Sequence, residues 1–299
     1  MGKRPEPLLS ASLESVKDCL DILVINDNGE NPENLEAVNQ SSLFKANKIH
    51  LITSDFNGFA QARNVCLEYL KGLGTKPGEL WILKLDADEV HTPGIYNLTR
   101  KILPRLNSDI GGIDGYWLLF IQSFEYFARF ERRHDLLVRF RPEMRWEGRV
   151  HETLEGKSGR VIPLPYLYFH YGYVAEASQI LAKWEQYREM GDRNFSFLAK
   201  ANPNTLLDAD SRTQFPLRAP HPQAALGAIE KLKIQHGENY LKFAELIKSQ
   251  QTSKNRLAIF LKYWNYRQLI FFRKLQALSQ PNIRLEIKQM LYANREYRI

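Results

Sequence analysis

Apolar residues in the first third of the chain alternate between helical spacing and the unbroken runs of buried strands. Helical spacing over residues 8–20 precedes a short apolar run at 22–25, which ends in the polar sequence Asn-Asp-Asn-Gly. A second unit repeats this order, with a predicted strand at 49–52, a helix at 58–73 and a buried strand at 79–85. Because fully apolar strands that alternate with helices are typical of parallel sheets, we predict an α/β fold with a mixed, mainly parallel sheet and flanking helices.

The second half of the chain changes from strands to helices. Residues 116–122 and 136–140 have the composition of further strands, and helical spacing follows Val174. Four prolines lie within residues 200–224, which we interpret as a linker. We therefore expect an α/β domain over residues 1–199, the linker, and an α-helical region over 225–299.

Charge is distributed unevenly along the chain. The formal net charge is +7, yet residues 226–299 hold 14 Lys and Arg against 5 Asp and Glu. The part before them is nearly neutral, so we expect a small-molecule site there and an acidic partner for the basic tail, such as an anionic membrane or a second subunit. Nucleic acid is a weaker alternative that we do not expect as a partner.

The tail also carries apolar and aromatic residues at helical spacing from Leu257 to Leu275, with Lys and Arg among them. A helix of this kind can lie on an anionic membrane surface. It can equally pack on the catalytic domain or form a homo-oligomer, and packing within a protein is the commoner way to cover such a face.

Cysteine usage and hydropathy indicate the compartment. Cys19 and Cys66 are the two cysteines, so neither a disulfide framework nor a Cys-rich zinc site is predicted. The opening residues lack the apolar run of a secretory signal, and no apolar stretch of about 18 residues is present to cross a bilayer. We expect a cytoplasmic protein, which the basic tail could place at the inner face of the membrane.

Asp86 and Asp88 directly follow the predicted buried strand at 79–85. Ligands of parallel α/β sheets bind beyond the carboxyl ends of the strands, and two carboxylates there can share a divalent cation with a phosphate. The same three letters recur at 208–210 without a buried strand before them, so we interpret that copy as a turn or helix cap. Capping of a following helix is the structural alternative for Asp86 and Asp88.

Several segments, taken together and in order, carry a resemblance to a known family. These are residues 12–16, Asp-Phe-Asn-Gly-Phe-Ala-Gln-Ala-Arg-Asn at 55–64, Trp81 to Glu89, Arg-Trp-Glu-Gly-Arg-Val-His-Glu at 145–152, and His-Tyr-Gly-Tyr at 170–173. Over about residues 8–190 the chain resembles the family 2 glycosyltransferases of the GT-A fold. The resemblance implies a nucleoside-diphosphate sugar as donor, with a sugar, lipid or peptide as acceptor.

The resemblance also implies roles for individual residues. Asp27 would bind the nucleoside, and Arg63 and Asn64 would line the same pocket. Asp86 and Asp88 would hold Mn²⁺ or Mg²⁺ together with the diphosphate. Arg63 and Asn64 have a structural alternative, because residues at a helix start can bond their own loop.

An inverting transfer needs a carboxylate that takes the proton of the acceptor hydroxyl. Glu152 is our candidate for this base, with Asp114 and Asp135 as weaker alternatives. His151 and His170 could each supply a neutral imidazole to the metal or a hydrogen bond to the diphosphate. A structural role among aromatic neighbours is the alternative for His170.

The chain departs from the family at its start. Family members begin with a strand before the first helix, whereas residues 1–7 here are charged and contain proline. Either the true start lies upstream, or the protein has lost a strand of its nucleotide site. The second reading leads to an alternative function, an inactive GT-A-like binding protein that docks on a membrane or partner through its basic tail.

Overall fold

The computed structural model describes residues 1–74, 76, 78–149, 152–175, 177–191, 214–250 and 253–297. His151, the triplet at 208–210 and most of the predicted linker lie outside these residues.

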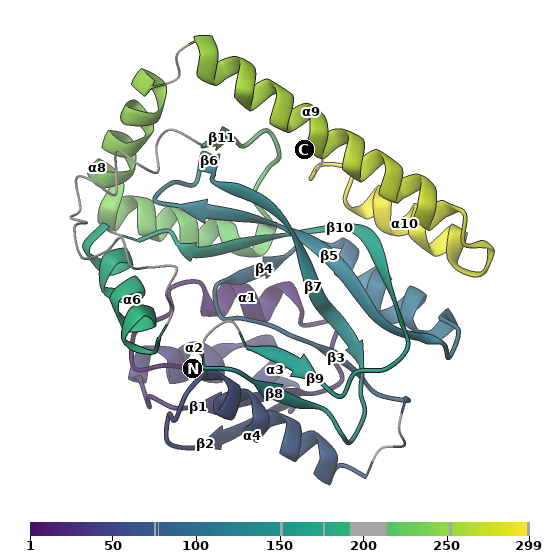
Figure 1. Ribbon diagram of the computed structural model, residues 1–299. Helices are drawn as coiled ribbons and strands as arrows, with labels where there is room; N and C mark the ends of the chain where they lie inside the picture. Colours follow the sequence, from purple (N-terminus) through teal and green to yellow (C-terminus); the bar gives the residue numbers. More distant parts are fainter. Residues whose placement is uncertain are drawn as a thin grey trace.

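A five-stranded sheet forms the centre of the molecule (Figure 1). Its order is β3 (Trp81–Leu83), β7 (Arg129–Arg139), β5 (Ile110–Ile121), β10 (Arg160–Tyr173) and β4 (Glu89–His91). Strands β5 and β10 are rich in aromatic and branched residues, which favour a pleated, buried surface, whereas β7 carries many charged residues. Apolar clusters pack on the sheet, and the charged residues of β7 leave part of one face for a polar site.

The prediction of a mainly parallel sheet is wrong. Strands β1 (Leu23–Asp27) and β2 (Ile49–Thr53) do pair in parallel, but they form a separate two-stranded sheet. Within the large sheet, β5 and β10 are parallel and every other pairing among the described residues is antiparallel. The run of apolar residues identifies a buried strand but contains no information on its direction, which the short connection from β5 to β7 decides.

The first part of the chain follows the predicted order of elements. The helices predicted at 8–20 and 58–73 are confirmed as α1 (Leu9–Ser15) and α4 (Phe59–Gly72). Helix α2 (Pro32–Gln40) begins with proline, and the side chain of Asn31 caps it by accepting a hydrogen bond from the Asn34 backbone at 3.1 Å.

Among the described residues no strand joins β1 to the large sheet. The start of the chain lies against the end of β1 instead: the Met1 amino group donates to the Asn26 carbonyl at 2.5 Å, and the Asn28 N–H donates to the Met1 carbonyl at 2.9 Å. The end of β1 therefore has a polypeptide neighbour although its edge has no further strand.

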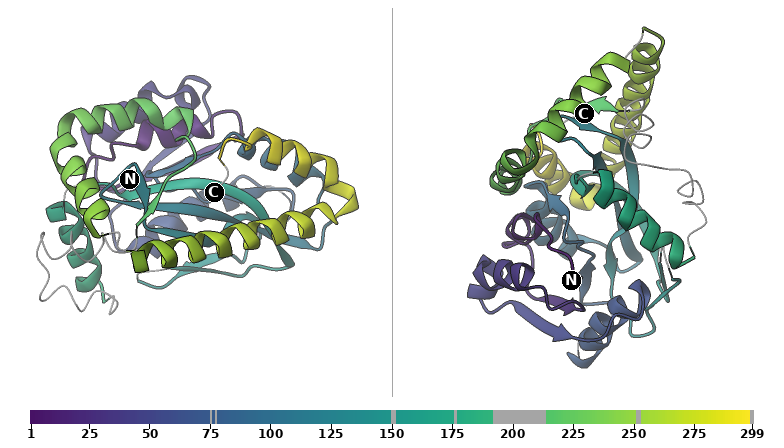
Figure 2. Two further views of the ribbon diagram at one scale, coloured as in Figure 1. Left: turned by 90° about the horizontal axis from the view of Figure 1, so that it is seen from above. Right: turned by 90° about the vertical axis from the view of Figure 1, so that its left-hand side faces the viewer.

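Helices close the structure after the sheet. Helix α6 (Ala177–Glu189) lies beside the site end of β10, and α8 (Leu226–Gln250) bends at His236. Helix α9 (Ser253–Leu278) runs along the outside of the molecule, and α10 (Arg284–Ala293) turns back against it (Figures 1 and 2). The shorter elements are α3 (Ser42–Lys45), α5 (Gly94–Asn97), η1 (Leu98–Ile102), η2 (Leu103–Arg105), β6 (Tyr126–Phe127), β8 (Arg145–Glu147), β9 (Thr153–Glu155), β11 (Phe215–Pro216), η4 (Gln223–Ala225) and η5 (Pro281–Ile283).

The C-terminal helices share apolar cores with the sheet. Ile287 and Met290 of α10 are fully buried in the same cluster as Ile95 and Leu98. Tyr263 of α9 is buried in the aromatic cluster on the other side. None of the helices in the described part of the chain combines the length and hydropathy that a bilayer span requires. The fold is thus a mixed α/β structure with a helical C-terminal region.

Candidate active site

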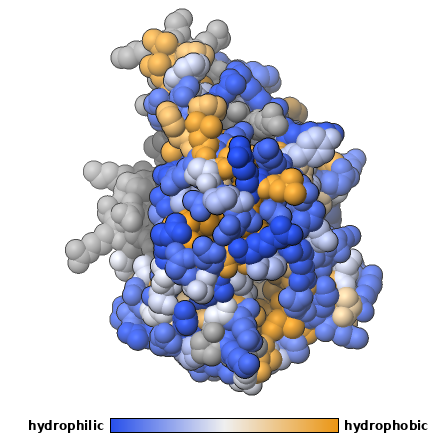
Figure 3. Space-filling view, turned by 90° about the vertical axis from the view of Figure 1, so that its right-hand side faces the viewer, coloured by the Kyte–Doolittle hydropathy of each residue, from blue (hydrophilic) through white to orange (hydrophobic). Residues whose placement is uncertain are grey.

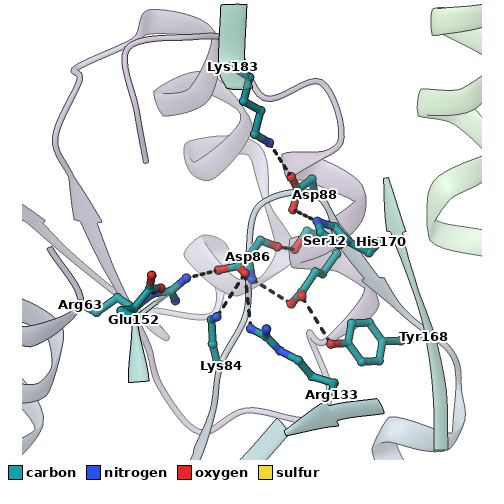
Figure 4. Close-up of polar contacts among 11 residues, drawn as sticks. Ser12, Arg63, Lys84, Asp86, Asp88, Arg133, Glu152, Tyr168, His170 and Lys183 are labelled. Atoms are coloured by element: carbon teal, nitrogen blue, oxygen red, sulfur yellow. Dashed lines mark hydrogen bonds and ion pairs between the residues drawn. The ribbon is translucent and has the colours of Figure 1, made fainter. Parts of the chain in front are cut away.

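The predicted acidic residues lie in a tight turn between β3 and β4 (Figure 4). The Glu89 N–H donates to the Asp86 carbonyl at 3.1 Å, and the Asp86 N–H donates to the Glu89 carboxyl at 3.1 Å. The Ser12 hydroxyl of α1 adds a hydrogen bond to the same carbonyl at 3.2 Å. These bonds fix the backbone from which both carboxylates project.

Three basic side chains surround Asp86. An Arg63 nitrogen lies 2.8 Å from one carboxylate oxygen, and the Lys84 and Arg133 nitrogens lie 3.6 and 3.7 Å from the other. Burial opposes ionisation of Asp86, but the positive charges of Arg63, Lys84 and Arg133 outweigh it and hold its pKa well below the ordinary value. Asp86 is therefore an ionised carboxylate whose negative charge is already balanced by neighbouring basic side chains.

Arg63 connects this cluster to Glu152. Its Nε lies 2.5 Å from a Glu152 carboxylate oxygen while its terminal nitrogen reaches Asp86, and the guanidinium lies 5.2 Å from the centre of the Trp146 ring. Burial opposes the charged form, but the two carboxylates raise the pKa of Arg63. Arg63 thus brings two of the predicted site residues, Asp86 and Glu152, to one place.

Asn64 uses its side chain in a different way. Its amide nitrogen donates to the Trp146 carbonyl at 3.0 Å, and its amide oxygen accepts from the Trp146 N–H at 2.7 Å. Both polar groups of Asn64 therefore join α4 to β8. This contact also holds the Trp146 ring in place beside Arg63.

Asp88 faces the opposite side of the turn, toward β10 and α6. His170 Nε2 lies 3.3 Å from one carboxylate oxygen and Lys183 Nζ lies 3.6 Å from the other. Burial opposes ionisation, yet the charges of His170 and Lys183 bring the pKa of Asp88 down to about 2. Burial also opposes protonation of His170, but Asp88 raises the pKa of this imidazole, whose ring stacks on Trp117 at a centroid distance of 4.4 Å.

Gly172 has no side chain, and this lets the His170 and Asp88 side chains lie against its backbone. A methyl group in place of its hydrogen would lie 2.5 Å from His170 Nε2 and 2.6 Å from an Asp88 carboxylate oxygen. Any larger residue would displace one of these side chains. The positions of His170 and Asp88 therefore require glycine between the two tyrosines of the His-Tyr-Gly-Tyr segment.

Asp27 lies apart from this cluster, at the end of β1. Its side chain is buried, and one carboxylate oxygen accepts hydrogen bonds from the N–H groups of Gly29 and Glu30, both at 3.2 Å. The other oxygen is also buried and has no hydrogen-bond partner among the described residues. Because buried carboxylate oxygens are nearly always bonded, this atom is an available acceptor.

The alternative bases differ from Glu152 in their surroundings. Asp114 is buried and engaged by Arg132, by His134 and by the Asp135 N–H. Asp135 forms an ion pair with Lys157 at 2.7 Å. Within the part of the chain that the structure describes, neither aspartate shares a contact with the cluster around Asp86.

Sequence analysis named Arg63 but missed the other three cations of the site. Lys84 could have been found, because a lysine inside a buried apolar strand needs a partner. Arg133 depends on the register between β7 and β5, where it lies opposite Gly115, and Lys183 depends on the position of α6. Neither position can be read from local spacing.

The charge of the site differs from that of a closed metal centre. Within the described residues no three His, Cys, Asp or Glu side chains are close enough to form a metal-binding group. Arg63, Lys84, Arg133 and Lys183 instead surround the carboxylates from several elements (Figure 4). Such a concentration of cations around a strand-to-turn connection is what an anionic, phosphate-bearing ligand requires.

The fold and the site therefore define the chain as a mixed α/β protein with a cation-lined site suited to an anionic ligand. Residues 3–116 match the family model described as Glycosyl transferase family 2, so this part of the chain is similar to the family 2 glycosyltransferases. The resemblance found in the sequence is thereby confirmed, and the family implies the GT-A fold. No curated protein matches the chain. The match includes Arg63, Asp86 and Asp88 but ends before Glu152, His170 and Lys183.

Proposed function

We propose that the chain transfers a sugar from a nucleoside diphosphate to an acceptor with inversion at the anomeric carbon. The proposal rests on one observation: four cations surround the ionised Asp86 and Asp88, namely Arg63, Lys84, Arg133 and Lys183. Their number exceeds that of the three carboxylates they contact, which are Asp86, Asp88 and Glu152. A departing diphosphate supplies the missing negative charge, and cations placed where charge develops stabilise the transition state most.

A divalent cation, Mn²⁺ or Mg²⁺, belongs to this proposal, since family 2 enzymes commonly use such metals. Asp88 and His170 fit it, because their polar atoms face each other at 3.3 Å and the missing side chain of Gly172 lets both approach its backbone. Metals that act on diphosphates need only one or two protein ligands, with phosphate oxygens and water as the others. When bound, the metal would neutralise charge on the diphosphate. Asp86 fits this role less well, because three cations already contact it.

Glu152 is the proposed base. The acceptor hydroxyl gives its proton to the Glu152 carboxylate while its oxygen attacks the anomeric carbon, and the bond from that carbon to the diphosphate oxygen breaks. Arg63 holds Glu152 in place at 2.5 Å and simultaneously contacts Asp86 at 2.8 Å. The base and the diphosphate cluster are thus fixed relative to each other by one side chain.

The nucleoside would extend from the cluster toward β1. The unpartnered buried oxygen of Asp27 offers an acceptor for a base or ribose group, as the family resemblance implies. Asn64 contributes indirectly in this proposal, because it positions Trp146 rather than a ligand.

A donor screen tests the proposal. Thermal unfolding of the full chain is followed with UDP, GDP, CDP and their common sugars, with and without Mn²⁺. We expect one nucleotide to raise the melting temperature, and Asp88→Asn to weaken its binding at least tenfold, whereas Asp109→Asn, at an exposed carboxylate paired with Arg160, leaves it unchanged. With the preferred donor, NMR of the product anomer reports inversion. Failure of every nucleotide to bind would contradict the proposal and favour the inactive binding protein.

A further inference from the structure

The outward face of α9 is apolar along most of its length. Helix α9 packs on the sheet through one side, where Tyr263 is buried and Ile259, Tyr266 and Ile270 are partly buried against the aromatic cluster. The large apolar side chains on its opposite side are between 50% and 62% exposed, namely Leu257, Phe260, Leu261, Trp264, Phe271, Phe272 and Leu275.

These side chains form a stripe of two groups, one from Leu257 to Trp264 and one from Phe271 to Leu275. At 100° per residue they span about 120° of the helix circumference, centred on the direction opposite Tyr266. Gln268 is the only polar residue within that sector between Leu257 and Leu275. Orange side chains recur down the side of the molecule along which α9 runs (Figure 3). A soluble monomer rarely exposes so long an apolar stripe, so the stripe needs a cover.

The charge of α9 indicates what that cover is. The 26 residues of the helix contain six Lys or Arg and no Asp or Glu. Arg267 is exposed and lies about 20° beyond one border of the stripe. An apolar stripe with a cation at its border, on a helix that has no acidic residue, matches the interface of an anionic bilayer, where apolar side chains enter the acyl region and cations meet headgroups.

The same charge argues against a second copy of this chain. Two α9 helices packed stripe to stripe would bring twelve basic residues together without an acidic residue from either helix. Such like-charge contacts are destabilising. Phe260, Trp264, Phe271 and Phe272 are also large, rigid side chains of the kind that insert into a membrane interface.

We infer that the outward face of α9 is a docking surface for anionic lipid bilayers. The helix lies in the plane of the interface, with the sheet above it and the aromatic stripe below. The observation is independent of the sugar transfer, because the stripe uses none of the residues of the candidate active site.

Vesicle sedimentation of the full chain tests the inference. We expect binding to vesicles of phosphatidylcholine with 30% phosphatidylglycerol, and binding that weakens as salt rises because exposed charges are screened. Arg267→Gln should weaken it about fivefold, the loss expected for one cation near the membrane surface. Phe271→Gln with Phe272→Gln should weaken it by about 100-fold or more, since each ring loses its transfer into the interface.

A matched control lies in α3. Phe44 and Lys45 are also an exposed aromatic and an exposed cation, but they lie far from α9 in sequence. Phe44→Gln with Lys45→Gln should leave vesicle binding unchanged. In addition, vesicles should shift the tryptophan emission to the blue in the parent, and Trp264→Phe should remove that part of the shift while binding persists.

Three results would overturn the inference. One is absence of binding to anionic vesicles at low salt. Another is equal loss of binding in the α3 control and the α9 variants. The third is a stable dimer by light scattering that Phe271→Gln with Phe272→Gln dissociates while the parent ignores vesicles, which would assign the stripe to a second copy.

Discussion

Replacing Gly172 with alanine adds a single carbon atom to the candidate site. The added methyl carbon would lie 2.5 Å from His170 Nε2 and 2.6 Å from an Asp88 oxygen, whereas ordinary contact needs about 3.5 Å. One or both side chains must therefore move by about 1 Å. Overpacking of this kind costs about 1–3 kcal/mol of folding free energy. A displacement of about 1 Å near the chemistry also lowers rates about 100-fold.

The assay compares rate, binding and stability in the same preparations. Initial rates of sugar transfer are measured with the donor found in the nucleotide screen, binding of its nucleoside diphosphate by calorimetry, and stability by urea unfolding. We expect Gly172→Ala to lower kcat/KM about 100-fold while the protein remains folded. Gly227→Ala is the matched control, since a methyl group there has no atom within 4 Å and helix α8 gains an alanine.

Two outcomes would refute this reasoning. A Gly172→Ala variant with a rate within about threefold of the parent would show that the space beside Asp88 and His170 is not needed. A loss of activity equal to that of Gly227→Ala would show that the effect is not local.

Three further predictions concern neighbouring residues. Asp86→Asn should lower the unfolding free energy in urea by about 1–3 kcal/mol, because Arg63 and its neighbouring cations lose a charged partner. Lys183→Gln should weaken nucleoside diphosphate binding about tenfold in calorimetry and reduce its salt dependence, with little change in melting temperature. Burial lowers the pKa of His91 to about 3, so the unfolded chain binds a proton that the folded chain does not between pH 6.5 and 3, and stability falls as the pH falls. His91→Gln should remove a slope of about 1.4 kcal/mol per pH unit in that window.

Local periodicity was sufficient for the elements that carry the acidic pair. The strands predicted near 22–25, 49–52 and 79–85 correspond to β1, β2 and β3, and the helices predicted at 8–20 and 58–73 to α1 and α4. Each depends on residues within about one element length, which is the range that helical and strand spacing can report. The direction of the strands depends on how distant segments pair, and there the prediction was wrong.

The sequence treats Asp86 and Asp88 as equivalent, but the structure does not. One residue apart in a turn, they point to different partners: Asp86 to Arg63, Lys84 and Arg133, and Asp88 to His170 and Lys183. Arg133, His170 and Lys183 lie 45 residues or more after the two aspartates in the chain, whereas Arg63 and Lys84 precede them. No spacing rule within the triplet could separate the two roles.

The site is assembled from two portions of the chain, one inside the family match and one beyond it. Residues 3–116 match the family and supply the turn with its two carboxylates and Arg63. Strands β7 and β10 and helix α6 lie beyond that match and supply Arg133, His170 and Lys183. A carboxylate pair alone would repel a diphosphate, and two of the four cations that let the turn accept one, Arg133 and Lys183, come from the later portion. Exchanging the later cations should therefore change which anionic ligand the turn accepts, while the fold of the first portion, which has its own helices and strands, stays the same.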